Sequence, residues 1–272
     1  VNRVEGYVAL QEEHPWLNLW LLPQCVCGLA ATRNEIILRT IGRGPVMMMD
    51  DDLTSMAMTV HSSRTVSGFE GKALSLSDVA RLMLATTRMF PHAKVVSINH
   101  WHHHCTLASH PGGVRAGLQH LSFQPVLLNL PSPVPPSVLM RYSHCDDEEF
   151  AYRVHSVLHN DMPSALRGPY FPIVKLRFII AKFDVGMEAG GLQGTGSAAA
   201  LAHGKAEQTE AAAQLIGEFP DAFEWIQQSA MEGRLKGPRA RLFLPFAKCQ
   251  EVQQDLYFEG QPAGVAICRM LD

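Results

Sequence analysis

The chain has 272 residues, 47% of them hydrophobic, and this content favours a folded chain over a disordered one because it is enough to build a buried core. Charged residues make up only 18% and the formal net charge is -3, which disfavours a nucleic-acid partner because no bulk positive field faces its phosphates. No apolar stretch reaches the length of a membrane span, so none is expected.

In the first part of the chain, short apolar runs predict strands and a longer periodic segment predicts a helix. Glu35–Ile41 and Pro45–Met49 are apolar runs separated by glycines, and we expect them to be neighbouring strands. Apolar residues then recur at helical spacing as far as Phe90, and Ser75 or Ser77 can cap the start of that helix.

Four prolines between Pro131 and Pro136 interrupt the middle of the chain and mark the best candidate boundary. The pattern predicts a strand-rich N-terminal lobe at 1–130, a Pro-rich connector at 131–137 and a C-terminal α+β lobe at 138–272. A single domain accommodates the same elements.

After the prolines, helices and strands alternate irregularly. We expect a helix at Asp147–His159, a central or near-central strand at Ile173–Val185, a helix at Ala206–Ile216 and a closing strand at Gly264–Leu271. Because no βαβ rhythm is present, the pattern favours the α+β class, with a mixed sheet and helices packed on it.

The densest group of potential metal ligands follows a strand expected at Lys94–Asn99. His100, His102 and His104 would project from one face of an extended segment, because side chains alternate along a strand. Imidazoles in that arrangement can bind zinc or another divalent metal. The alternative is that these histidines are structural.

A second candidate metal site is acidic. Asp50 and Asp52 follow the apolar run that ends at Met49, and Asp184 ends the strong run Phe178–Asp184. Carboxylates that converge at strand ends can hold a divalent metal for phosphoryl chemistry. The alternative is that the aspartates form a polar turn.

Three pieces of sequence carry a resemblance to a known family. They are Met-Asp-Asp-Asp-Leu-Thr at 49–54, His-Ser-Ser at 61–63, and His100 or His102 further along. Together they loosely resemble the primase-polymerase family of plasmid replication proteins. That resemblance implies a nucleotidyl transferase that uses Asp50, Asp52 and Asp184.

The six cysteines are too few and too scattered for a disulfide framework in a chain of this length. We therefore expect mostly reduced, buried thiols and an intracellular protein. The chain begins at Val1 rather than Met, which is compatible with removal of a targeting peptide and location in an organelle. Polyprotein processing, or expression of a shortened chain, would give the same start.

Low charge and high apolar content, without a coherent catalytic motif, favour a non-catalytic structural or accessory subunit whose partners are other protein subunits. The segments expected to contact them are Trp16–Leu21 and Val126–Val138, which combine large apolar side chains with few charges. The alternative is a metal-dependent enzyme of the hydrolase or hydratase type that uses the histidines. The third interpretation is the primase-like transferase.

Overall fold

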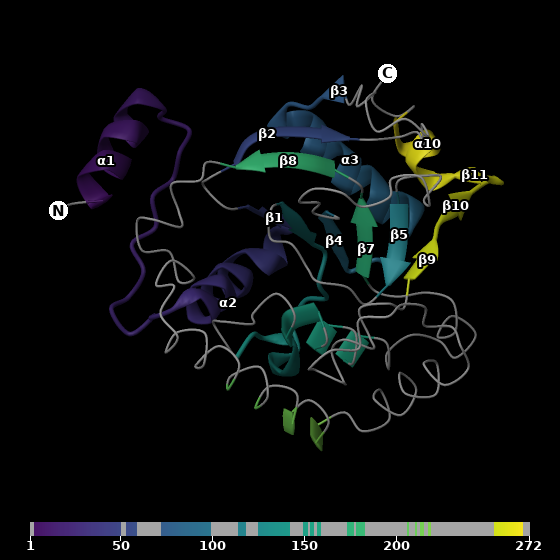
Figure 1. Cartoon of the computed structure of the whole chain (residues 1–272). Coiled ribbons are helices and arrows are strands. Elements are labelled where there is room, and N and C mark those ends of the chain that lie inside the picture. The colour runs from purple at the N-terminus through teal and green to yellow at the C-terminus, as the bar shows by residue number, and fades with distance from the viewer. Residues whose placement is uncertain are drawn as a thin grey trace.

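The computed structural model belongs to the α+β class, with helices and a small mixed sheet, as the sequence predicts (Figure 1). It describes residues 3–49, 53–58, 72–98, 114–117, 125–141, 149–151, 153–154, 157–158, 173–176, 178–182, 206, 210, 213–214, 217–218 and 253–268. The division into two lobes stays a prediction. Among these residues, no helix is both long and apolar enough to cross a membrane.

Six strands form the larger sheet, in the order β1-β6-β4-β7-β5-β9. Strands β4 and β7 run parallel and the other neighbours are antiparallel. Strands β4 and β6 are buried at Val95–Ser97 and Val126–Leu128, as expected for strands covered on both faces. The strands are β1 (Val46–Met48), β4 (Val95–Ile98), β5 (Val114–Gly117), β6 (Val126–Leu128), β7 (Ile173–Leu176) and β9 (Gln253–Asp255).

The apolar run that begins at Ile173 supplies strands to two different sheets. Its first part is β7, which lies inside the six-stranded sheet and confirms the expected central strand. Its second part, β8 (Phe178–Lys182), pairs with β2 (Leu53–Met58) in a three-stranded sheet with β3 (Lys72–Ala73). The prediction of one strand as far as Val185 was therefore wrong, because the run changes partners after Leu176.

Helix α3 (Leu76–Met89) confirms the helix expected in this region, and it packs against β4 and β6. Ser75 is its N-cap: the Asp78 backbone N–H donates to Ser75 Oγ at 3.1 Å, and the Ser75 backbone N–H donates to Asp78 Oδ2 at 3.0 Å. Val79, Leu82 and Met83 bury one face of the helix. The capping box and the apolar spacing thus act together to fix this helix.

Helix α2 (Leu29–Thr40) corrects the strand expected at Glu35–Ile41. The apolar and β-branched residues after Glu35 suggested a strand, but they continue a helix that already begins at Leu29. Ala30 and Ile37, two helical turns apart, are buried in the same core cluster. The helical period therefore decides which of these residues are covered.

The closing strand expected at Gly264–Leu271 is also wrong, because Ala263–Cys268 form helix α10, which packs against α3. A two-stranded hairpin precedes it, and its turn places Glu259 and Gly260 at positive φ. Helical residues also occur between 149 and 158 and between 206 and 218, in agreement with the helices expected there. The remaining short elements are η1 (Ile41–Arg43), η3 (Pro136–Val138), β10 (Tyr257–Phe258) and β11 (Gln261–Pro262).

Candidate functional site

The residues that the sequence analysis proposed as metal ligands lie outside the described part of the chain. These are His100, His102 and His104 of the histidine group, and Asp50, Asp52 and Asp184 of the acidic group. Both metal-site hypotheses stay predictions. Among the residues that are described, no three His, Cys, Asp or Glu side chains come together to hold a metal ion.

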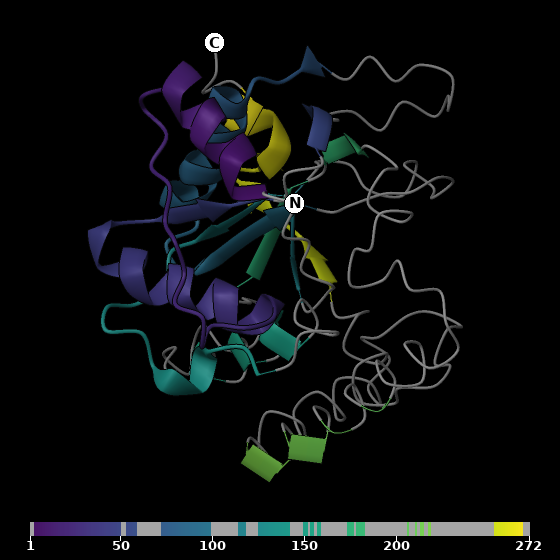
Figure 2. The ribbon, with the colours of Figure 1, turned by 90° about the vertical axis from the view of Figure 1, so that its left-hand side faces the viewer.

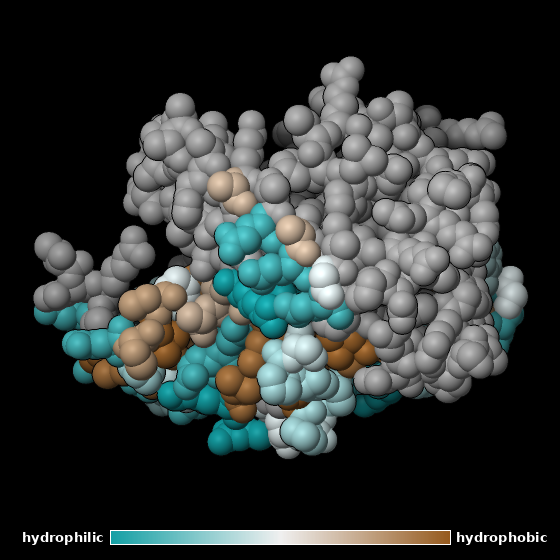
Figure 3. All heavy atoms as spheres, turned by 90° about the horizontal axis from the view of Figure 1, so that it is seen from below, coloured by the Kyte–Doolittle hydropathy of each residue, from teal (hydrophilic) through white to brown (hydrophobic). Residues whose placement is uncertain are grey.

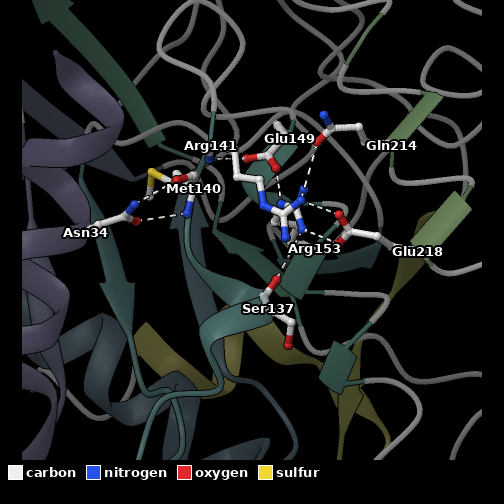
Figure 4. A network of polar contacts seen from close by, with 8 residues as sticks. All are labelled: Asn34, Ser137, Met140, Arg141, Glu149, Arg153, Gln214 and Glu218. Atoms are coloured by element: carbon white, nitrogen blue, oxygen red, sulfur yellow. Dashed lines mark hydrogen bonds and ion pairs between the residues drawn. The ribbon is translucent and has the colours of Figure 1, made fainter.

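The described residues do contain a buried polar network, which lies beside η3 and the helical residues from 149 onwards (Figure 4). At its centre, Arg153 is fully buried and its Nε donates to Glu149, one helical turn earlier. Both side chains have an exposed fraction of 0%. A charged pair can be buried in this way only because each partner neutralises the other.

Two further charged residues complete the network from distant parts of the chain. Arg141 lies just after η3, and Glu218 lies at the end of the described helical residues between 206 and 218. One carboxylate oxygen of Glu218 accepts from Arg141 Nη1, and the other accepts from Arg153 Nη1 at 2.9 Å. Each oxygen of one carboxylate is therefore held by a different guanidinium group.

Backbone groups fix the two arginines in place. The Arg141 backbone N–H donates to Glu149 Oε2 at 3.2 Å, and Arg153 Nη1 donates to the Ser137 carbonyl at 3.4 Å. Arg141 also donates to Gln214 Oε1 at 3.4 Å. By contrast, Arg153 Nη2 is buried and has no hydrogen-bond partner among the described residues.

The two carboxyl groups of the network have opposite pKa shifts. Burial raises the pKa of the Glu149 carboxyl, and the charge and hydrogen bond of Arg153 only partly oppose this effect. Partial burial would also raise the pKa of Glu218, but the hydrogen bond and charge of Arg153, together with Arg141, outweigh it and lower that pKa. Glu218 is therefore held as a carboxylate by the arginines.

Arginine side chains bind anions but do not exchange protons near neutral pH, because the guanidinium group stays charged. The two arginines are thus suited to holding a carboxylate rather than to acid–base chemistry. The sequence analysis identified the apolar face of this helix and overlooked Glu149 and Arg153. Their four-residue spacing, typical of a helical ion pair, was the available signal.

A second feature is the N-terminal arm, which we define as residues 3–27. It contains α1 (Arg3–Glu13) and the chain that leads to α2, and α1 lies at one side of the molecule (Figures 1 and 2). Trp16 and Leu21 of the arm have exposed fractions of 75% and 77%. Other large apolar side chains of the arm that are exposed are Tyr7, Val8, Leu10 and Trp20.

Specific contacts order the arm. Gln11 Nε2 donates to the Leu17 carbonyl at 2.8 Å, which ties α1 to the chain that follows. The Arg39 guanidinium of α2 lies 5.7 Å from the centre of the Trp20 ring, a cation–π distance, and Arg39 also pairs with Glu35. The arm is thus attached to α2 through Trp20, while Trp16 and Leu21 face solvent.

The structure corrects two expectations about exposure. The stretch Val126–Val138 is not an exposed apolar patch, because β6, Leu130, Val134 and Val138 are buried in the core. Conversely, Cys25 and Cys27 are free thiols that lie exposed in the arm rather than buried. Seen from below, the described surface shows apolar groups interspersed with hydrophilic ones (Figure 3).

Comparison with known proteins identified no relative of this chain. No protein-family model matches the chain, and neither the curated proteins nor the solved structures gave a match.

Proposed function

We propose that this protein is an accessory subunit of a larger protein assembly and that its N-terminal arm binds another subunit. The observation that carries the proposal is the exposure of Trp16 and Leu21, at 75% and 77%, on the same segment. Tryptophan and large aliphatic side chains are the groups that most often anchor protein interfaces.

The contacts of the arm support a binding role over a merely displaced piece of core. Trp20 stacks near Arg39, and Gln11 is hydrogen-bonded to Leu17, so the exposed side chains extend from an ordered segment. Ordering before association lowers the entropic cost of binding. The arm also combines apolar groups with the carboxylates of Glu12 and Glu13, which fits a partner surface that is apolar with a basic rim.

The proposal is tested by placing a photo-crosslinking amino acid at position 21 and irradiating the protein in an extract of the cells that make it. We expect a discrete crosslinked product with one partner subunit. The combined variant Trp16→Ser and Leu21→Ser should remove the protein from its complex, so that it elutes at the mass of a single chain.

The matched control is Tyr257→Ser, which changes an aromatic residue with an exposed fraction of 54% outside the arm. This variant should stay in the complex, and a crosslinker at position 257 should give no product with the same partner. Circular dichroism must show that all variants are folded. If the protein elutes as a single chain from the extract and position 21 gives no product, the proposed function is wrong.

A further inference from the structure

We infer that Arg141 and Arg153 form a carboxylate-binding site that Glu218 of the same chain occupies, and that an external carboxylate can take the place of Glu218. The site is separate from the N-terminal arm and does not depend on the proposed function. Its ligand class is a carboxylate, either as a small free molecule or as an acidic side chain of a peptide.

The geometry is that of a receptor for one carboxylate group. The two Glu218 oxygens are divided between the two arginines, with Arg153 Nη1 at 2.9 Å from Oε2 and Arg141 Nη1 paired with Oε1. Contacts of guanidinium groups with a carboxylate are charge-assisted and directional, and they recur where proteins recognise anions. In Figure 4 both arginines point toward Glu218.

The charges of the site require one anion in addition to Glu149. Glu149 is fully buried beside Arg153 and accepts from the Arg141 backbone, so it belongs to the fixed wall of the site. If Glu218 moves away, Glu149 is the carboxylate among the described residues that still contacts the two arginines. Within the described part of the chain, one positive charge then lacks a counter-charge at a partly buried position, where an anion would be stabilised.

Arg153 has further capacity to bind an oxygen ligand. The side chain of Arg153 is fully buried, and its Nη2 has no hydrogen-bond partner among the described residues. A buried N–H group without a partner is unfavourable, and an added oxygen acceptor would relieve it. The described contacts of Arg153 therefore leave one of its nitrogens without an acceptor.

Glu218 is the carboxylate of the network best placed to leave. Its side chain has an exposed fraction of 31%, whereas those of Glu149 and Arg153 are fully buried. Four of the described residues between 206 and 217 are exposed: Ala206, Glu210, Ala213 and Gly217. Within the described residues, the contacts of this segment that the structure defines are those of Gln214 and Glu218 with the two arginines.

The test is to empty the site and offer acetate. In Glu218→Ala, acetate should raise the melting temperature above that in chloride of equal ionic strength by about 2–4 °C. The wild-type protein should show a much smaller difference between the two salts. The double variant Glu218→Ala and Arg141→Ala should lose most of the acetate effect, because half of the receptor is gone.

Glu218→Gln keeps the size of the side chain and serves if the alanine variant does not fold. For wild type and the glutamine variant, side-chain NMR signals of ¹⁵N-labelled arginine are followed during titration with acetate and, separately, with a neutral peptide that contains one glutamate. We expect two arginine signals to shift, at lower ligand concentration in Glu218→Gln. Tighter binding of the peptide would identify a protein segment as the ligand, and equal or weaker binding would identify a small carboxylate.

The inference is overturned if neither ligand shifts the arginine signals of Glu218→Gln. It is equally overturned if a folded Glu218→Ala has the same melting temperature in acetate and chloride. These results would leave the network as internal ion pairs, and they do not bear on crosslinking through the N-terminal arm. Failure of the two proposals can therefore be told apart.

Discussion

The side chain of Asn34 forms two hydrogen bonds with the backbone of Met140, 106 positions further along the chain. Its Nδ2 donates to the Met140 carbonyl at 2.7 Å, and its Oδ1 accepts from the Met140 N–H at 2.9 Å. The amide thus satisfies both backbone groups of one residue, as a neighbouring strand would do. These two hydrogen bonds connect α2 to the chain that follows η3.

Asn34→Ala should therefore destabilise the protein by about 2 kcal/mol, because it leaves both backbone groups of Met140 without their partner. Urea unfolding measures the change. Asn18→Ala is the control, since Asn18 is exposed in the arm, and its effect should stay within about 0.5 kcal/mol. Equal stability of the two variants would show that the contact with Met140 contributes nothing.

Helix α2 offers a matched pair of adjacent residues. Ile37 is fully buried in the core cluster, whereas Leu38 has an exposed fraction of 54%. Ile37→Ala should lower the free energy of unfolding by about 2–5 kcal/mol, and Leu38→Ala by less than about 1 kcal/mol. Thermal or urea unfolding checks both. A larger loss of stability in Leu38→Ala than in Ile37→Ala would show that the face of α2 with Leu38, not the face with Ile37, packs against the core.

The cap of α3 makes a smaller but specific contribution. Ser75→Ala removes the acceptor for the Asp78 N–H and should cost about 1 kcal/mol of stability. Ser77→Ala is the control, because Ser77 is exposed in the first turn and is not the cap. Urea titrations of the two variants should give different midpoints; coincident midpoints would contradict the assignment of Ser75 as the cap.

Glu218 should make stability depend on pH in the acidic range. The arginines lower its pKa in the folded state below the ordinary value of 4.5, so its stabilisation is fully present above 4.5 and is lost as the pH falls through the lower, folded-state pKa. Near neutral pH, the free energy of unfolding of the wild type should exceed that of Glu218→Gln by about 1 kcal/mol. The value is modest because the contacts of Glu218 with the arginines are partly exposed to solvent. The difference should disappear in strong acid.

Unfolding of both proteins by urea at a series of pH values measures this difference directly. Glu149 is present in both proteins, so its own titration largely cancels. A difference that stays constant from neutral to strongly acidic pH would show that the charge of Glu218 is not what stabilises the network.

Local patterns predicted some elements well because their causes are local. Helix α3 has both a capping serine and apolar residues at helical spacing, and β4 is a short apolar run that follows a turn. The run at Glu35–Ile41 misled because β-branched residues favour strands only weakly, and its helix begins six residues earlier, at Leu29. The fold class followed from the mixture of elements, but the pairing of β8 with β2 depends on contacts between distant segments.

The network around Arg153 also combines a local contact that the sequence could predict with distant contacts that it could not. Glu149 and Arg153 are four residues apart, so their pairing on a helix could have been read from the sequence. Their burial could not, because charged residues on an amphipathic helix usually face water. The approach of Glu218 to Arg141, 77 positions apart, depends on how the whole chain folds.

The strand order of the larger sheet has a consequence for the protein while it is being synthesised. Strand β5 pairs only with β7 and β9, both of which lie later in the chain. It must therefore leave the ribosome before either neighbour exists, and β4 must likewise wait for its parallel partner β7. Until then the nascent chain displays strand edges with unpaired N–H and C=O groups, which readily pair with other chains. A ribosome-associated chaperone that covers residues 95–117 until β7 emerges would protect these edges, and a pause in translation before Ile173 would prolong their exposure.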